Sequence, residues 1–249
     1  MMADFNSWIA AFGKEIPELF WYWLAGWAWS YVLLVVTISL FRRPLSKVIG
    51  HFDGKVRRLA HRWRYKGQQT QEEQLLERVM LTWFFRFWTN FASAPSLIFF
   101  SFAVPIVIYM NAPESSTLFR GTGIWLLPGL CYAGSMLLSF WLKRVFKRVR
   151  PEREEGAFGH KLRDHSFPSG HSLTSFCFWI MCIASFAASH SGAMLWIFGI
   201  AATLVVLLTG MSRIYLAVHW PSDVMGGYCI GTLWTFVCYV VLFHQLVRI

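Results

Sequence analysis

Residues 173–211 read LTSFCFWIMCIASFAASHSGAMLWIFGIAATLVVLLTGM, a stretch without a single Asp, Glu, Lys or Arg. Two apolar runs, about Leu173–Ser189 and Met194–Met211, lie on either side of the polar turn His190–Gly192. The hydrocarbon core of a bilayer is about 30 Å thick, so about 20 apolar residues cross it as a helix. This stretch therefore predicts two membrane-spanning helices joined by a short turn.

Similar apolar runs occur elsewhere in the chain. Only 14% of the 249 residues are charged, against roughly 25% in a soluble domain. Small residues recur inside the runs, as is typical of helices that pack closely in lipid. We predict an all-α, polytopic transmembrane helix bundle of about six spans, the other four being about Phe20–Phe41, Pro95–Met110, Gly123–Leu142 and Val224–His244.

The chain is expected to form one membrane domain over residues 1–249, with N-terminal spans in 1–122 and a core in 123–249. A basic segment, Arg42–Arg78, separates the first two spans. It is interpreted either as a surface helix on anionic lipid or as a solvated loop. The aromatic stretch Val79–Ala94 carries Arg86 and Asn90, which favours an interfacial helix over a seventh span.

Three polar clusters border the apolar runs: Lys143–Pro151, Pro168–His171 and Ser212–Asp223. No crossing separates the first cluster from the second. Two crossings, joined by the turn after Ser189, separate the second from the third. All three clusters are therefore expected at one membrane face, and polar groups that converge at one depth indicate a functional site.

The residue types in these clusters suit a phosphate group. Lys143, Arg150 and Arg213 supply cationic donors, and a guanidinium matches two phosphate oxygens at once. Ser169 and Gly170 open a helix, where free backbone N–H groups and the helix dipole favour an anion. Gly170 also permits close approach of the backbone, and Ser169 adds a hydroxyl donor.

The two histidines can divide the chemistry between them. His219 is followed four residues later by Asp223, which would hold one ring nitrogen as N–H and leave the other to attack phosphorus. His171 would donate a proton to the leaving oxygen. Asp223 is the only acidic residue in the third cluster, so we expect no metal and no other cofactor.

Each residue also has a structural interpretation. Lys143 and Arg150 could be ordinary charges flanking a span, Arg213 could extend toward the interface, and Asp223 could simply cap a helix. The joint spacing favours the functional interpretation. Four residues of the loop between the first two clusters are interpreted as loop residues or as lining the point where substrate enters: His160, Arg163, Asp164 and His165.

These clusters resemble the signature of the type 2 phosphatidic acid phosphatase family. That signature is Lys, six residues, Arg-Pro; then Pro-Ser-Gly-His; then Ser-Arg, five residues, His, three residues, Asp. The chain matches all three parts, at Lys143–Pro151, Pro168–His171 and Ser212–Asp223. The resemblance implies a six-helix bundle with its site at one membrane surface. It also implies His219 as nucleophile, His171 and Asp223 as catalytic partners, and a phosphate site formed by Lys143, Arg150, Ser169, Gly170 and Arg213.

The resemblance further implies hydrolysis of a lipid phosphate or diphosphate through a phosphohistidine, without metal. The substrates it suggests are phosphatidic acid, phosphatidylglycerol phosphate, undecaprenyl diphosphate or a lipid A phosphate. A lipid phosphotransferase and a non-catalytic lipid-phosphate binder or transporter remain alternatives. The net charge is +10, and the basic residues lie between the apolar runs. We therefore expect lipid partners and no nucleic acid. The oligomeric state stays open.

The compact loop between the first two motifs is similar to bacterial members, which implies a multi-pass protein of the bacterial inner membrane. Bacterial members usually place the site on the periplasmic face. With six spans, however, the site shares its face with the basic segment Arg42–Arg78, and positive charge favours the cytoplasmic face. Of the two faces we favour the periplasmic one.

Overall fold

The computed structural model describes residues 53–56, 71–111, 126–151, 164–187 and 190–240. These residues form helices joined by short segments, and no strand occurs among them. The prediction of an all-α fold is confirmed for this part of the chain. Besides the helical turn at residues 53–56, the helices are α3 (Gln71–Asn90), α4 (Ala94–Asn111), α6 (Leu127–Phe146), α7 (Gly170–Ala187), α8 (Ala193–Tyr215) and α9 (Pro221–Cys238).

Five of the six predicted spans correspond to α4, α6, α7, α8 and α9, whereas Phe20–Phe41 lies outside the described residues. Two of the predicted spans ended too early on the site side. Lys143 lies in the last turn of α6 and Arg213 in the last turn of α8, whereas α7 begins at Gly170, where a helix start was predicted. The apolar pattern ends where the side chains become polar, but the backbone hydrogen bonds of α6 and α8 continue by about a turn.

The stretch Val79–Ala94 is the end of one helix and the start of another. Helix α3 ends at Asn90, and α4 begins at Ala94 after a break across which the axes bend by 51°. Among the described helices, α7 and α8 are each long and apolar enough to cross a membrane, and the bent pair would add a third crossing if it counts as one span. The chain is thus a transmembrane helical protein.

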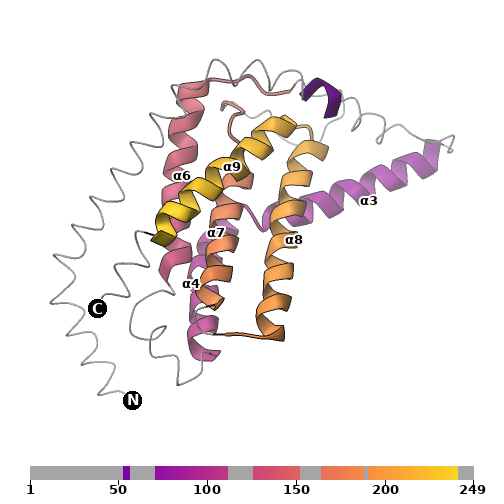
Figure 1. Cartoon of the computed structure of the whole chain (residues 1–249). Coiled ribbons are helices and arrows are strands. Elements are labelled where there is room, and N and C mark those ends of the chain that lie inside the picture. The colour runs from indigo at the N-terminus through magenta and orange to yellow at the C-terminus, as the bar shows by residue number, and fades with distance from the viewer. Residues whose placement is uncertain (1–52, 57–70, 112–125, 152–163, 188–189, 241–249) are drawn as a thin grey trace, which may run out of the picture.

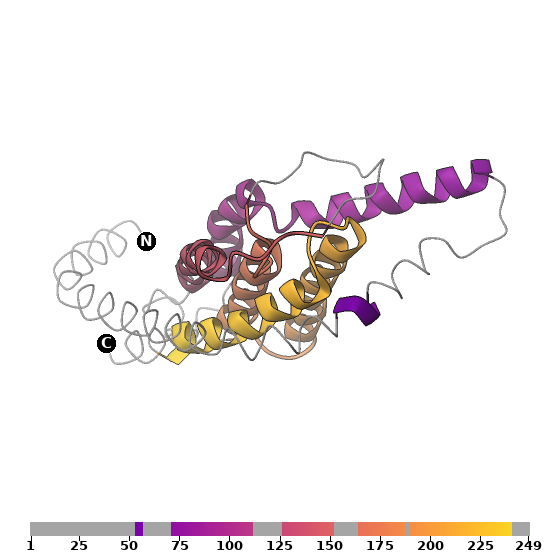
Figure 2. The same ribbon diagram turned by 90° about the horizontal axis from the view of Figure 1, so that it is seen from above.

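Helix α7 occupies the centre of the bundle, where it contacts α4, α6, α8 and α9 (Figures 1 and 2). Its inward side chains pack with α6 and α9 in a core that includes Leu138, Cys177 and Trp234. The Trp234 indole nitrogen donates to the Cys131 carbonyl oxygen of α6 at 3.0 Å. Peripheral α8 instead exposes a row of large apolar side chains, as a lipid-facing helix does: Met194, Trp196, Ile197, Ile200, Leu204 and Leu207.

One end of the bundle gathers the helix ends that carry the three polar clusters. The C-terminal ends of α6 and α8 and the N-terminal ends of α7 and α9 all lie at the top of Figure 1. The helical turn at residues 53–56 lies at the same end. The N-terminal part of helix α3 projects sideways from the bundle, whereas its C-terminal part packs against α8 (Figure 2).

Helices α7 and α9 approach each other closely at Gly227. A side-chain carbon placed there would lie 3.1 Å from the Ser169 carbonyl oxygen and 3.2 Å from the Leu173 backbone nitrogen. Both neighbouring atoms belong to the backbone at the start of α7, so neither can rotate away. Gly227 therefore sets the distance between the second and third polar clusters.

We expect Gly227→Val to destabilise the protein by about 1–3 kcal/mol, because the added carbons must push α9 away from α7. Gly199→Val is the matched control, since nothing lies within 4 Å of a side-chain carbon placed at Gly199 of α8. Thermal unfolding of both variants in detergent measures the difference. Equal melting temperatures would show that the α7–α9 contact tolerates the extra volume.

Candidate active site

Backbone hydrogen bonds fix the three polar clusters relative to one another. The Ser169 backbone N–H donates to the Asp223 carbonyl oxygen at 3.0 Å and so joins the start of α7 to the start of α9. The backbone N–H groups of Val218 and His219 both donate to the Arg213 carbonyl oxygen, at 3.2 and 3.3 Å. The segment between α8 and α9 is thus folded back onto the end of α8.

His219 and Asp223 are both buried and face each other. The Nδ1 atom of His219 lies 3.4 Å from Oδ2 of Asp223, and the two residues are about 3% and 0% exposed. The same Oδ2 accepts the Trp220 backbone N–H at 2.9 Å. Because α9 begins at Pro221, Asp223 lies in its first turn, where the helix dipole stabilises a carboxylate.

Arg150 contacts the other side of the His219 ring. Its Nη1 lies 3.1 Å from Nε2 of His219 and donates to the Val218 carbonyl oxygen at 2.6 Å. A guanidinium has five N–H donors and no acceptor. The contact is therefore a hydrogen bond only if Nε2 of His219 is unprotonated, so the ring proton belongs on Nδ1, beside Asp223.

The electrostatic surroundings of His219 favour the same neutral form. Burial, together with the nearby positive charges of Arg150, Arg213 and Lys143, lowers the pKa of His219 well below its usual value of 6.5. At neutral pH the ring is therefore uncharged and keeps a lone pair on Nε2.

A loop carboxylate bridges two of the predicted phosphate-binding cations. Asp164 forms an ion pair with Lys143 through Oδ2 and with Arg150 through Oδ1, the latter at 2.7 Å. Partial burial opposes its ionisation, but Lys143 and Arg150 outweigh burial and lower the pKa of Asp164 to about 2. Asp164 was predicted to be a loop residue or to lie where substrate enters. The structure places its negative charge between cations predicted to bind phosphate.

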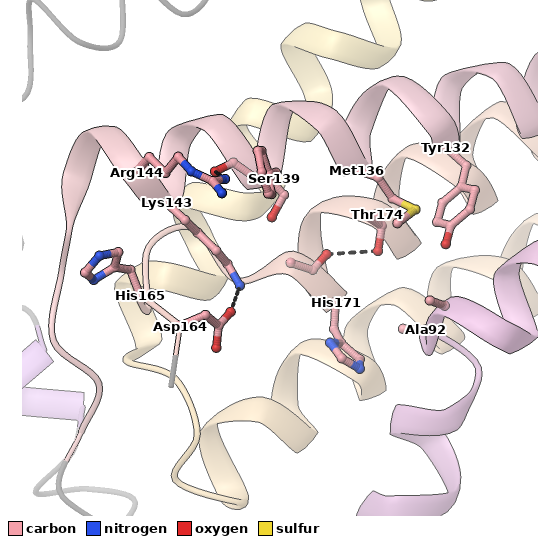
Figure 3. A pocket seen from close by; sticks show the side chains of 13 residues that line it. Ala92, Tyr132, Met136, Ser139, Lys143, Arg144, Asp164, His165, His171 and Thr174 are labelled. Atoms are coloured by element: carbon pink, nitrogen blue, oxygen red, sulfur yellow. Dashed lines mark hydrogen bonds and ion pairs between the residues drawn. The ribbon is translucent and has the colours of Figure 1, made fainter. Parts of the chain in front are cut away.

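A cavity of about 540 Å³ opens beside this ion pair (Figure 3). Lys143, Asp164 and His171 line one end, whereas Met136 and Tyr132 line the other, so the cavity has a charged end and a less polar end. Its remaining lining residues come from α4, α6, α7 and the segments beside them: Ala92, Ala94, Ser139, Phe140, Arg144, His165, Gly170 and Thr174.

The start of α7 forms the floor of the charged end. A side-chain carbon at Gly170 would lie 3.3 Å from the Ser139 hydroxyl oxygen and 3.8 Å from the Lys143 amine, so glycine leaves room for that amine beside the helix. Ser169 is fully buried at the N-cap, where its hydroxyl accepts the Ser172 hydroxyl proton at 2.9 Å.

Arg213 forms a hydrogen bond with α3, a helix that carries none of the three polar clusters. Its Nη1 donates to the Thr89 hydroxyl at 2.9 Å, and the neighbouring Ser212 hydroxyl donates to the same Thr89 oxygen at 2.9 Å. Thr89 lies in the last turn of α3. Helix α3 therefore reaches the site, which the sequence did not indicate.

The structure brings all eight predicted site residues to one end of the bundle. The positive charges of Arg213, Lys143 and Arg150 act on both His171 and His219, which places the two histidines within one electrostatic cluster. The predicted roles of these residues stay predictions. Among the described residues, no three His, Cys, Asp or Glu side chains form a group that could hold a metal ion.

Arg148 and Asp53 also contact the site, but the sequence motifs did not indicate a role for either residue. Arg148 donates to Oδ1 of Asp223 at 2.7 Å and forms an ion pair with Asp53, which is buried against the start of α9. Arg148 belongs to the basic run after Lys143, where it looks like a flanking charge. Asp53 lies within the basic segment Arg42–Arg78, and no motif surrounds it.

Parts of this chain are similar to known proteins. The model of the PAP2 superfamily matches residues 124–246. Phosphatidylglycerophosphatase B of Bacillus subtilis (strain 168) is 33% identical over 147 residues, which cover 55% of this chain and 66% of that protein. The putative undecaprenyl-diphosphatase YbjG of Escherichia coli (strain K12) is 32% identical over 106 residues, which cover 42% and 50%. The chain thus spans between half and about two thirds of these two relatives.

A solved structure shares the fold. It is the crystal structure of a transmembrane PAP2-type phosphatidylglycerolphosphate phosphatase from Bacillus subtilis. The TM-score is 0.58 at 22% identity, with 87% of this chain and 94% of that chain covered. The covered share of this chain is larger than residues 124–246 alone.

Proposed function

Because the chain belongs to the PAP2 superfamily through residues 124–246, we propose that it is a membrane enzyme that hydrolyses a lipid phosphate or diphosphate. The observation that carries this proposal is the contact between Arg150 and Nε2 of His219 at 3.1 Å. It supports a neutral histidine whose lone pair points toward cations suited to phosphate. That is the arrangement needed to form a phosphohistidine.

The proposed reaction has two steps. In the first, Nε2 of His219 attacks phosphorus while the bond to the lipid oxygen breaks, and His171 protonates that oxygen as the alcohol leaves. In the second, His171 takes a proton from water as the water attacks the phosphohistidine, which releases inorganic phosphate and restores His219. Asp223 holds the Nδ1 proton throughout.

The cations and the start of α7 would stabilise the phosphoryl group in transfer. Lys143, Arg150 and Arg213 balance the charge on its three equatorial oxygens. The backbone N–H group of Gly170 adds a donor from a helix N-terminus. A bound phosphate dianion would offset the charge of the three cations near His171 and so favour the protonated form that donates to the leaving oxygen.

Asp164 occupies the place where we expect the phosphate to bind, because it pairs with both Lys143 and Arg150. The substrate must therefore displace this carboxylate. Acid does not assist the displacement in any ordinary assay, because the pKa of Asp164 is about 2.

We expect Asp164→Asn to bind orthovanadate or inorganic phosphate roughly two- to fivefold more tightly, because a half-exposed ion pair contributes at most about 1 kcal/mol. Inhibition constants measured against lipid phosphate hydrolysis provide the test. Asp164→Glu keeps the charge and should stay close to the wild-type protein. Weaker inhibition of Asp164→Asn would instead mean that Asp164 organises the cations for phosphate.

The cavity supports a lipid substrate. Its charged end contains Lys143 and His171, and its less polar end contains Tyr132 and Met136 (Figure 3). We propose that the phosphate binds at the first end and the adjoining part of the lipid at the second. The candidate substrates are phosphatidic acid, phosphatidylglycerol phosphate, undecaprenyl diphosphate and lipid A phosphates.

A panel of these lipids, incubated with purified protein in detergent and EDTA, tests the proposal by release of inorganic phosphate. We expect release from at least one member in the presence of the chelator, because the three cations supply the positive charge that catalysis needs. No release from any member, with or without Mg²⁺, would contradict a hydrolase. Transfer of labelled phosphate to an added lipid would identify a phosphotransferase, and binding without turnover would identify a non-catalytic binder.

We further propose that the chain is a single domain with six spans, set in a bacterial inner membrane with the site on the periplasmic face. The gathering of four helix ends at one end of the bundle supports a site at one membrane surface (Figure 1). Reporters fused after residue 66 and after residue 160 test the topology, because six spans place both positions on one face. Readings on opposite faces would contradict six spans, and cytoplasmic readings for both would contradict the periplasmic site.

A further inference from the structure

Asp53 lies far from the three motifs in sequence but directly behind them in the fold. Its side chain is buried, with about 3% of the residue exposed. Oδ1 accepts the Ser222 backbone N–H at 2.9 Å, and Oδ2 accepts the Ser222 hydroxyl at 2.7 Å. Asp53 thus binds the first turn of α9, one residue before Asp223.

Arg148 links Asp53 to the proposed catalytic pair. Its Nη2 forms an ion pair with Oδ2 of Asp53, and its Nη1 donates to Oδ1 of Asp223 at 2.7 Å. Nη1 also donates to the Ser222 hydroxyl at 2.6 Å. One guanidinium therefore lies between two carboxylates, and Oδ2 of Asp223 remains directed at Nδ1 of His219.

We propose that Asp53 is a positioning residue for the formation of the phosphohistidine, acting through Arg148 and Asp223 on His219. This inference rests on the proposed function. Asp53 does not touch the substrate; it sets the charge and the orientation of the groups behind the nucleophile.

The charge balance of the first step gives the physical reason. When the Nε2–P bond forms, the His219 ring keeps its Nδ1 proton and acquires one positive charge, while the electron pair of the broken P–O bond goes to the leaving oxygen. Asp223, Arg148 and Asp53 together carry one net negative charge, which offsets the positive ring. Without Asp53 the set would be neutral, and the phosphorylated ring would be less stable.

The orientation of Arg148 gives a second reason. A partly buried guanidinium with one free side would be attracted to any phosphate nearby. Asp53 occupies that side, so Arg148 stays against Asp223 instead of adding a fourth cation to the phosphate site. Oδ2 of Asp223 is then free to accept from the His219 ring.

The test compares Asp53→Asn with the wild-type protein in full-length, detergent-solubilised form. The amide keeps the shape, and its oxygen can still accept the Ser222 backbone N–H. Its nitrogen cannot accept from Arg148 or from the Ser222 hydroxyl, so the charge and the contacts of Oδ2 are removed together. We expect kcat for the lipid phosphate to fall about tenfold, the scale on which partners behind a functional histidine act. The KM should stay within about twofold, because Asp53 does not contact substrate.

The pH profile separates a charge effect from loss of structure. His219 is faced by Asp223 from α9, Lys143 from α6, Arg150 from the segment after it, Arg213 from α8 and His171 from α7. Removing one negative charge behind this group disfavours the protonated ring. The acidic limb of kcat/KM should therefore move to lower pH in Asp53→Asn, which a loss of folded protein would not produce.

Two further variants complete the experiment. Asp53→Glu restores the charge and should recover most of kcat. Lys55→Gln changes an exposed charge on the same helical turn and should match the wild-type protein. An Asp53→Asn variant with unchanged kcat and pH profile would overturn the inference while leaving the proposed function intact. A wild-type protein without turnover would instead overturn the proposed function.

Discussion

His219→Ala is expected to abolish turnover, with a loss of at least about 10³-fold in kcat, since removal of an enzyme's nucleophile typically costs this much or more. The alanine variant retains Lys143, Arg150 and Arg213, so it should still bind phosphate. Two measurements check the expectation: release of inorganic phosphate from the lipid substrate, and alkali-stable phosphate label on the protein. Both signals should disappear together.

The matched control is His190→Phe. His190 lies at the other end of α7, where its ring stacks on Phe186 with centroids 4.1 Å apart, and phenylalanine can keep this contact. The control should retain turnover. Turnover in His219→Ala at a level comparable to the control would contradict a phosphohistidine at this position.

Arg150→Lys is expected to lower kcat/KM by about 10²-fold, and Arg150→Ala by more. Lysine keeps the positive charge but cannot reproduce the fork that contacts Nε2 of His219, the Val218 carbonyl oxygen and Asp164 together. Removal of one donor to a transition-state oxyanion commonly costs about 10²–10³-fold in kcat. Steady-state kinetics with a lipid phosphate measures the loss.

Arg86→Lys is the control for this exchange, because Arg86 lies on α3, with its guanidinium 5.9 Å from the ring centre of Trp83. It should behave like the wild-type protein. If Arg150→Lys also kept wild-type kcat/KM, the charge alone would be sufficient. The hydrogen bond to His219 would then have no part in orienting the nucleophile.

The sequence predicted the positions of five helices because a run of apolar residues without charge has few alternatives to a buried or lipid-facing helix. It also predicted that the motifs would share one end of the bundle, because crossings can be counted from apolar runs. The helix ends were less accurate. Lys143 and Arg213 lie inside helices, because a helix continues into the interface where its side chains are already polar.

The side chains behind the site could not be predicted in the same way. Thr89 contacts Arg213 because α3 bends by 51° relative to α4 and then packs against α8, and no local pattern encodes that packing. Asp53 reaches Arg148 across 95 positions of sequence. A single carboxylate in a basic segment looks like a surface residue until its partner is known.

The contact between Thr89 and Arg213 has a consequence for any attempt to produce residues 124–246 as a separate fragment. Residues 124–246 contain every motif, yet Thr89 and Asp53 come from earlier in the sequence and complete the surroundings of Arg213 and Arg148. A fragment trimmed to the motif-bearing half would keep its signature but lose these two supports. Grafting the three motifs onto an unrelated helical bundle would transfer the signature residues without the contacts that orient their side chains.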